Sequence, residues 1–456
     1  YTVKAKNTSF RLERFSAAAL AELAAISRKP LVSYGKRSQR PVWLIGEQPL
    51  KAQDSGAVLF RYLRNAHPEI DAYYVLDAAS PDRAEIQDLD HIVDYRSAEH
   101  NRLAATAEAL VGTHHPDYLL PTRSEKFQRV VRATKVFLQH GVIGMKWLNT
   151  LYGRKVPSFS TDLFMVSSER EKQLVVRDLG YDPDMVKPTG LPRFDQLFDG
   201  TVQADPHKLL IMPTWRPWLQ TDDGFQASQY FEAWRDLLSS DRLRALAEEQ
   251  DLDIMFLLHP NMSTYKRHFE DLGATVAIQG EVNIQQMLRE AGTLITDYSS
   301  VAWDFSFLHK PVVFYQFDSK RMFRGSRPHA DLAKELPGPI VRDLDGVLDA
   351  LDAIAAADFT MDEHYIHRAD RFIADRDTLH SERVFQAIRD TPRPALPTRP
   401  QAVGELENML FRRFRKSKYY HPLMRTMYKV VSKFPADHDL IVFEAGLGRQ
   451  LNDSPK

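Results

Sequence analysis

The sequence contains no cysteine among its 456 residues. This absence excludes disulfide bonds, thiolate nucleophiles and zinc sites built on cysteine, and it is typical of proteins kept in a reducing compartment. No apolar run approaches the roughly 20 residues of a membrane-spanning helix, and no signal peptide is visible. With a net charge of −1, the chain as a whole gives no electrostatic indication of nucleic-acid binding.

The length of the chain indicates more than one domain. A single core rarely serves 456 residues, so two domains of roughly 150 to 200 residues with additional segments are expected. The hydrophobic share of 43% and the charged share of 27% are typical of an ordinary globular protein. Because the sequence begins at Tyr1 rather than at a methionine, we expect it to be a piece of a longer chain.

Strand-like apolar runs alternate with helical stretches over most of the sequence. Such alternation indicates parallel α/β sheets, and a break near 200–207 divides it into two halves. We therefore predict an α/β protein with two Rossmann-like domains facing a cleft, with ligands bound at the carboxyl ends of the strands. The expected strands are 42–47, 72–77, 91–95, 109–113, 136–141, 163–168, 208–215, 253–260, 275–280, 293–297 and 311–317, and the expected helices are 10–28, 55–66, 98–108, 169–179, 228–249 and 283–291. The expected segments are an N-terminal helical extension (1–40), a first domain (41–203), a second domain (204–390), a linker with a basic segment (391–437) and the start of a further module (438–456).

The region after residue 390 changes character. Residues 391–400 hold four prolines in ten positions, which predicts a stiff linker. Residues 410–434 carry eight Lys or Arg and no Asp or Glu, interleaved with apolar side chains. This pattern fits a basic amphipathic segment at an anionic membrane surface, and it fits equally well a connecting helix with one solvated face.

The last residues of the chain resemble an earlier part of it. Residues 440–456 and 44–56 each contain an apolar strand, then Glu, then Leu three positions later, then Asp-Ser. Internal similarity of this kind indicates a repeat. It predicts that a second, similar catalytic module begins near residue 440 and is cut off.

The stretch Asp-Tyr-Ser-Ser, residues 297–300, lies between a predicted strand and a predicted helix. Free backbone N–H groups and the positive dipole at a helix N-terminus attract phosphate. Ser299 and Ser300 would add hydroxyl donors, and Asp304, one turn further on, could position a ribose. The alternative is that one of the two serines is merely an N-cap.

The stretch Met-Pro-Thr-Trp-Arg-Pro-Trp, residues 212–218, follows the first strand of the second half. The guanidinium of Arg216 is a natural fork for a phosphate, and Trp215 or Trp218 could stack on a base. The alternative is a surface arginine beside a tryptophan wedged between loops.

Histidines also follow strands. His140 and His259 come at strand ends in different halves, and such a pair fits general acid–base chemistry as well as it fits two structural histidines. Lys146, six residues after His140, could meet the same charge. His114 and His115 follow another strand, but no Asp, Glu or His partner stands at a usable spacing, so no metal is predicted.

Together these motifs resemble those of a known family. The chain is similar to the CDP-glycerol glycerophosphotransferases, the teichoic acid polymerase and primase group of bacterial cell-wall enzymes. The combination of PTWR with a downstream DYSS, DF, KP and FY is specific to this group. The matching segments, in the order of the family, are 44–56, 114–120, 138–146, 189–197, 212–218, 257–260, 294–305, 310–318 and 336–345, so the resemblance covers both halves.

The resemblance implies a GT-B fold and a CDP-polyol donor, CDP-glycerol or CDP-ribitol, held mainly by the second half. It implies transfer of the polyol phosphate to a hydroxyl of a growing, lipid-linked polymer. We expect no cofactor, no metal and no nucleic-acid partner, because cationic side chains and a helix N-terminus can stabilise the phosphates and the net charge is near zero. The enzyme would be peripheral, at the cytoplasmic face of the bacterial plasma membrane, with an anionic membrane surface as a partner. His140 corresponds to the base proposed for the family and His259 to its strand-end histidine. The implied donor-binding residues are Thr214, Arg216, Asp297, Ser299, Ser300 and Asp304, and the implied acceptor-side residues are His115, Lys146 and Arg193.

The sequence departs from the family pattern at two places. The family commonly has HGTP where this chain has Val142 and Ile143 after Gly141, and it commonly has HY where this chain has Pro260 after His259. These changes leave the donor site intact and put the acceptor and donor-tail specificity in question. Two other functions stay open: a nucleotide-sugar glycosyltransferase on the same fold, and a weakly active module that binds the polymer within a tandem enzyme.

Overall fold

The computed structural model describes residues 2–5, 8–11, 13–28, 40–128, 130–279, 281–392, 413, 417 and 419–422. The chain divides into two compact units, residues 1–394 and residues 395–456. Most of the predicted basic segment and all of the predicted truncated module therefore lie outside the described residues. Among the described residues, no helix combines the length and the apolarity needed to span a bilayer.

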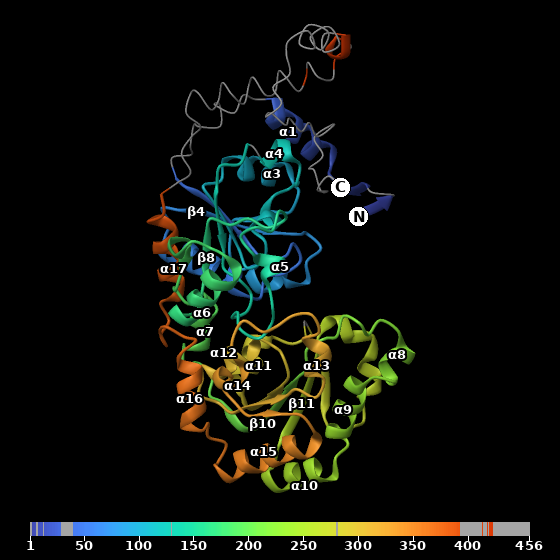
Figure 1. Ribbon diagram of the computed structural model, residues 1–456. Coiled ribbons are helices and arrows are strands. Elements are labelled where there is room, and N and C mark those ends of the chain that lie inside the picture. Colours follow the sequence, from blue (N-terminus) through green and yellow to red (C-terminus); the bar gives the residue numbers. More distant parts are fainter. Residues whose placement is uncertain are drawn as a thin grey trace, which may run out of the picture. The chain divides into compact units, whose positions relative to one another are not determined.

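The first half of the larger unit is built on a sheet of seven parallel strands in the order β5-β4-β3-β6-β7-β8-β9. Figure 1 labels β4 and β8 of this sheet. The strand β3 is buried along its whole length, since Trp43 and Ile45 enter one core and Val42 and Leu44 enter the core on the opposite face. The strands are β3 (Val42–Gly46), β4 (Asp71–Leu76), β5 (Ile92–Asp94), β6 (Ala109–Gly112), β7 (Thr134–Phe137), β8 (Leu163–Met165) and β9 (Val186–Lys187). The helices are α2 (Ser55–Ala66), α3 (Ala98–Thr106), α4 (Glu125–Gln128), α5 (Asn149–Tyr152) and α6 (Glu169–Leu174), which continues as a π-helical turn, Val175–Leu179.

The second half has six parallel strands in the order β12-β11-β10-β13-β14-β15. Its central strand alternates in the same way, with Leu209 and Ile211 in one core and Leu210 and Met212 in the other. The strands are β10 (Asp205–Met212), β11 (Asp253–Leu258), β12 (Thr275–Ile278), β13 (Ala291–Thr296), β14 (Val312–Tyr315) and β15 (Ile340–Val341). The short helix α7 (Phe194–Leu197) lies on the connection between the halves. The helices of the second half are α8 (Asp222–Gln226), α9 (Gln229–Leu238), α10 (Asp241–Gln250), α11 (Ile284–Glu290), α12 (Val301–Ser306), α13 (Ser319–Met322), α14 (Leu332–Glu335), α15 (Leu344–Ala356) and α16 (Glu363–Asp370).

Two predicted helices differ from the structure. The helix predicted over 10–28 is α1 (Ala17–Arg28), because Ser16 accepts the N–H of Ala19 and begins the helix there; the preceding residues form the hairpin of β1 (Thr2–Ala5) and β2 (Thr8–Arg11). The helix predicted over 228–249 is the pair α9 and α10. Ser240 interrupts it, since its hydroxyl accepts the N–H of Leu243 and caps a new helix.

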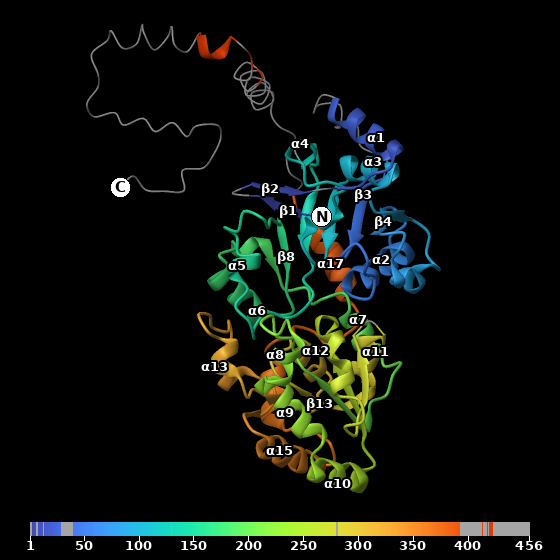
Figure 2. The same cartoon turned by 90° about the vertical axis from the view of Figure 1, so that its right-hand side faces the viewer.

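The last helix, α17 (His380–Arg389), returns to the first sheet, beside which Figures 1 and 2 show it in orange-red. Its residues Val384, Phe385 and Ile388 pack in the same core as Trp43, whose ring centroid lies 5.7 Å from that of Phe385. The chain therefore passes between the halves twice. The predicted second domain, 204–390, includes a helix whose apolar face belongs to the first core.

Candidate active site

The turn after β7 and the turn after β13 meet at Gly141 and Ser300. A Cβ atom added at Gly141 would lie 2.3 Å from Oγ of Ser300, which is closer than any real Cβ contact. A Cβ atom at Gly144 would lie 3.3 Å from the ring of Trp303. Only a residue without a side chain allows the first approach, so the loop that carries His140 lies directly against the Asp-Tyr-Ser-Ser stretch.

His140 is oriented by the neighbouring strand β6. Its Nδ1 lies 3.3 Å from the carbonyl oxygen of Thr113, which can only accept, so Nδ1 carries the proton and Nε2 holds a free lone pair. The ring stacks on His114 with centroids 4.3 Å apart and planes at 2°. The surrounding protein lowers the pKa of His140 below its ordinary value, although Asp54 opposes this shift. Because desolvation lowers its pKa, the imidazole is held as a neutral base, and the residue is still reached from solvent.

His259 has the opposite tautomer. It caps the 3-10 helix Pro260–His268, where its Nδ1 accepts the backbone N–H of Asn261 at 3.1 Å. The proton therefore sits on Nε2 and is available for donation. Burial lowers the pKa of His259 to about 4, and the charge of Lys146 acts in the same direction. The ring also stacks near Trp215, with centroids 5.8 Å apart.

Lys146 extends from the first half toward charges of the second. Burial lowers its pKa, Asp297 opposes that shift and Arg216 adds to it. It has no hydrogen bond or ion pair to any residue that the structure describes. Its charge acts on His140 and His259 as well as on Asp297 and Arg216, so this acceptor-side candidate lies near both the candidate base and the donor-side residues.

Arg216 is a buried brace between two strand ends. Its Nε and Nη2 donate to the carboxylate of Asp318 at 2.8 and 3.0 Å, and its Nη2 lies 2.8 Å from Oδ2 of Asp297. Burial opposes the charge, but the two carboxylates outweigh it and raise the pKa of Arg216. Oδ1 of Asp297 accepts the backbone N–H of Thr214 and of Tyr298. This set fixes the loops after β10, β13 and β14 against one another.

Three hydroxyls near this brace have no hydrogen-bond partner among the described residues. Ser300 stands at the N-cap of α12, but its side chain does not cap the helix. Ser299 likewise makes no side-chain hydrogen bond, and both serines are partly exposed. The Oγ1 atom of Thr214 is buried without a partner. The two serine hydroxyls are accessible to a ligand, whereas the Thr214 hydroxyl is enclosed by protein, and the capping interaction considered as the alternative is not made.

Asp304 and Arg193 form an ion pair between the halves. Nε and Nη2 of Arg193 donate to the carboxylate of Asp304 at 2.7 and 3.0 Å, and Nη1 lies 3.3 Å from Oδ1 of Asp54. Burial opposes the charge of Arg193, but the two carboxylates raise its pKa. Both residues were assigned to substrate binding from the sequence, and here they join α12 to the first half.

His115 uses both ring nitrogens within the protein. Its Nδ1 accepts the N–H of Asp117 at 3.0 Å, and its Nε2 pairs with the carbonyl of Ser158. No group of three or more His, Asp or Glu suited to a metal ion occurs in the described part of the chain.

Three further residues complete the site: His114, Asp54 and Asp318. The sequence offered His114 only as a possible metal ligand, and it assigned no role in the site to Asp54 or Asp318. Asp318 follows β14, so the rule that ligands gather at strand ends would have identified it. Asp54 caps α2, and a capping carboxylate gives no separate signal in the sequence. The stacking of His114 on His140 depends on the sheet order β6-β7, which the sequence does not state.

Comparison with known proteins identifies the family. The sequence profile described as CDP-Glycerol:Poly(glycerophosphate) glycerophosphotransferase matches residues 31–390. The minor teichoic acid biosynthesis protein GgaB of Bacillus subtilis is 26% identical over 369 residues, which cover 77% of this chain and 40% of that protein. A teichoic acid glycerol-phosphate transferase of Staphylococcus aureus is 26% identical over 61% of this chain and 75% of its own length. The chain thus spans less than half of GgaB, and it spans 36% of the teichoic acid poly(ribitol-phosphate) polymerase of Bacillus spizizenii.

Solved structures agree on the fold. A structure of the wall teichoic acid polymerase TagF superimposes with a TM-score of 0.58 at 17% identity, covering 82% of this chain and 98% of that chain. A putative UDP-N-acetylglucosamine 2-epimerase from Listeria monocytogenes gives 0.51 at 16% identity, covering 78% and 99%. The predicted GT-B-like arrangement of two parallel α/β sheets is confirmed. With a profile match over residues 31–390, the chain belongs to the CDP-glycerol:poly(glycerophosphate) glycerophosphotransferase family, a group of teichoic acid enzymes.

Proposed function

We propose that the chain transfers glycerol phosphate or ribitol phosphate from a CDP-polyol to a hydroxyl of a growing teichoic-acid- or capsule-like polymer and releases CMP. The names of its relatives support both polyols, and one TagF structure was soaked with CDPG. The observation that carries the proposal is the pairing of His140 and His259 on opposite halves, one with a free lone pair and the other with a free N–H.

The reaction begins at His140. Nε2 takes the proton of the acceptor hydroxyl as the hydroxyl oxygen attacks the β-phosphorus of the donor. The bond between the β-phosphorus and the oxygen that bridges the two phosphates breaks, and the electron pair leaves with CMP. The imidazolium then returns its proton to solvent. Phosphoryl transfer of this kind depends mainly on positioning and on stabilisation of charge.

The donor phosphates require cations and hydrogen-bond donors, and four side chains supply them. Lys146 offers an unpaired ammonium, His259 offers its Nε2–H, and Ser299 and Ser300 offer hydroxyls. Groups fixed before the reaction stabilise the developing charge without reorganisation at the moment of transfer.

The role of Arg216, Asp297 and Asp304 in this proposal is to hold the loops of the site in place rather than to bind the donor directly. Arg216 and Asp297 set the loops that carry Thr214 and the two serines, and Asp304 holds Arg193. Thr214 remains a direct donor ligand in this proposal because its buried hydroxyl has no partner.

The experiment is an assay of CMP release from CDP-glycerol and from CDP-ribitol. His140→Ala should lose roughly 10²- to 10⁴-fold in turnover, the range for removal of a general base. His367→Ala, which alters a histidine with a side chain 74% exposed on α16, is the matched control. Undiminished turnover by His140→Ala would remove this residue from the mechanism. Calorimetry with CDP and with UDP tests the alternative of a nucleotide-sugar donor.

The acceptor in this proposal is attached to a lipid carrier, which places the enzyme at the cytoplasmic face of the bacterial plasma membrane. The basic segment 410–434 is the predicted contact with the anionic lipid surface. Binding of the chain to vesicles that contain phosphatidylglycerol, compared with a variant that ends at residue 392, tests that contact.

A further inference from the structure

Two stretches of the chain are rich in Lys and Arg and free of acidic residues. No Asp or Glu occurs between Glu125 and Asp162, and none occurs between Asp318 and Asp331. The exposed cations at the ends of these stretches form a set that we name the basic strip. Its members are Arg154 and Lys155 beyond α5, and Lys320, Arg321, Arg324 and Arg327 in and after α13.

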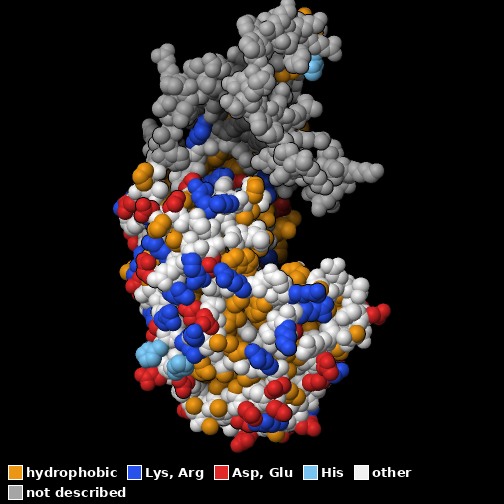
Figure 3. Space-filling model, viewed as in Figure 1, with side chains coloured by type: hydrophobic (Ala, Val, Ile, Leu, Met, Phe, Trp, Pro, Cys, Tyr) orange, Lys and Arg blue, Asp and Glu red, His pale blue; other side chains and the backbone are white. Residues whose placement is uncertain are grey.

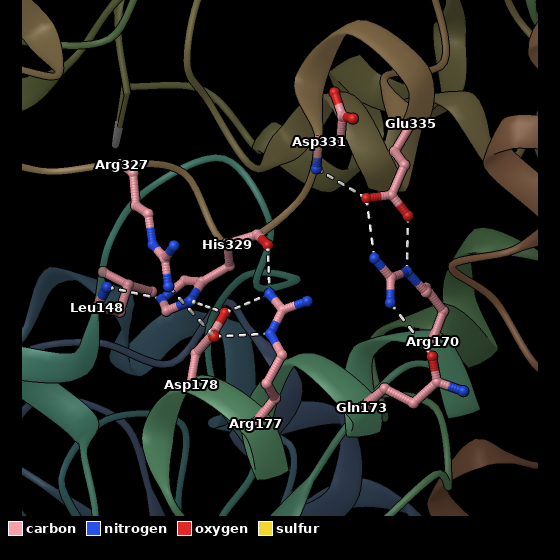
Figure 4. Close-up of polar contacts among 9 residues, drawn as sticks. All are labelled: Leu148, Arg170, Gln173, Arg177, Asp178, Arg327, His329, Asp331 and Glu335. Carbon is pink, nitrogen blue, oxygen red and sulfur yellow. Dashed lines mark hydrogen bonds and ion pairs between the residues drawn. The ribbon is translucent and has the colours of Figure 1, made fainter.

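The two parts of the strip are joined by a network between the halves (Figure 4). Asp178 accepts from Nδ1 of His329 at 2.9 Å and lies 4.0 Å from Nη2 of Arg327. Arg177 donates to the carbonyl of His329 at 2.8 Å, and Nε2 of His329 accepts the N–H of Leu148 at 2.9 Å. These contacts place the loop after α13 beside the segment that leads to α5.

Aromatic rings hold two cations of the strip in place. Arg321 lies over Trp218 at 4.8 Å, and Arg327 lies over Trp147 at 5.1 Å. Trp147 directly follows Lys146, so this end of the strip adjoins the residues that surround the reacting phosphates. In Figure 3, Lys and Arg side chains gather on both sides of the hollow between the two halves.

The cations are largely uncompensated. Apart from Arg327 with Asp178, no member of the strip makes an ion pair with any residue that the structure describes, and the side chain of Arg327 is 73% exposed. Arg177 shares the same aspartate. Six exposed cations with one ion pair among them constitute a local excess of positive charge in a chain whose net charge is −1.

We propose that the basic strip binds the acceptor polymer itself, a flexible polyanion with one phosphodiester per repeat, and leads its free end to His140. This inference rests on the proposed function and specifies the acceptor of that site. Successive phosphates would pair with guanidinium groups already oriented on Trp218 and Trp147. The enzyme would therefore hold an elongated chain more tightly than a single unit.

An anionic membrane is the competing partner for such a strip. Lipid binding by a basic surface is usually supported by apolar side chains that enter the interface. Among the described residues, the large apolar side chains more than a third exposed are scattered, and only Leu151 lies beside the strip. The polymer is therefore the better fit.

The test uses the whole chain with Arg321→Gln/Arg324→Gln and, as a matched control, Arg102→Gln/Arg244→Gln, which removes equal charge from α3 and α10. Binding of purified poly(glycerol phosphate) and poly(ribitol phosphate) is measured by calorimetry at several salt concentrations. CMP release is measured with a long polymer and with a soluble acceptor of one polyol phosphate unit.

We expect the KM for the long polymer to rise on the order of tenfold in the first variant, with the short acceptor unaffected. The slope of log Kd against log salt should also fall, because two phosphate contacts and the counterions that they release are lost. Equal effects on long and short acceptors, or none on either, would overturn the proposal. Loss of binding to phosphatidylglycerol vesicles with unchanged polymer binding would assign the strip to the membrane. Absence of CMP release by the unaltered chain would instead refute the proposed function, while the calorimetry would still test the strip.

Discussion

Gly141 and Ser300 lie so close that a Cβ atom on the glycine would stand 2.3 Å from the serine hydroxyl. This contact joins the loop of the candidate base to the loop of the candidate phosphate site, although 158 residues lie between Gly141 and Ser300 in the sequence. The loop of His140 can therefore approach the loop of Ser300 this closely because residue 141 has no side chain.

Gly141→Ala tests this contact. The added methyl should displace one loop, and a misplacement of about 1 Å can cost on the order of 10²-fold in kcat/KM. Ser300→Gly returns the space, so the double variant should be more active than the product of the two single effects predicts. Additive losses would show that the contact does not couple the loops. Steady-state CMP release is the measurement.

The ion pair of Arg193 with Asp304 provides a test of stability. Asp304→Asn leaves a buried guanidinium with only Asp54 as a charged partner, and removal of one member of a buried pair costs about 3 to 5 kcal/mol. Arg193→Met/Asp304→Leu should cost less, because no buried charge is left alone. Urea unfolding provides the free energies. A double variant less stable than either single one would contradict this explanation.

The pH dependence of turnover tests the role of Lys146. Because the pKa of His140 is lowered, the base stays unprotonated to a lower pH, and activity should fall only as the pH drops below the ordinary histidine range. Lys146 contributes to this shift by disfavouring a second positive charge. Lys146→Met should therefore move the acid limb of kcat/KM to higher pH and also reduce its maximum. An unmoved acid limb would separate Lys146 from His140.

Substitution of Arg216 tests whether this residue braces the loops or binds a phosphate of the donor. In Arg216→Met, Asp297 and Asp318 lose their buried partner, so the free energy of unfolding should fall by about 3 to 5 kcal/mol. Arg242→Met, which breaks an exposed pair on α10, is the control. If Arg216→Met instead binds CDP-glycerol more weakly and keeps its stability, Arg216 contacts the donor phosphate directly, as the sequence suggested.

The secondary structure was largely predictable where a local pattern decides it. The helix predicted over 55–66 matches α2, and the buried strands were found because both faces of the sheets are covered. The prediction of one helix over 228–249 was wrong, because the structure has two helices there. The apolar positions of α9 and α10 continue across Ser239 and Ser240, so periodicity alone did not reveal the break.

The sequence did not predict which distant residues contact one another in the folded protein. The sequence marks Arg216 as a candidate site residue, but its partners Asp297 and Asp318 are 81 and 102 positions further along the chain. No local pattern in the sequence indicates that these carboxylates pair with Arg216. Lys146 follows His140 in the sequence and is an acceptor-side candidate for that reason, but the sequence does not show that its charge also acts near Asp297. The docking of α17 on the first core likewise depends on a surface formed by distant strands.

The return of α17 limits how the two halves can move. One connection runs through α7, and a second runs between α16 and α17, where the N–H of Ala374 donates to the carbonyl of Ser167 at 2.9 Å. Two bodies joined by a single flexible linker can reorient about any axis, whereas two bodies joined at two points rotate mainly about the line between them. Substrate exchange should therefore proceed by rocking in one dimension, and a cross-link between the two connections should leave it unimpaired.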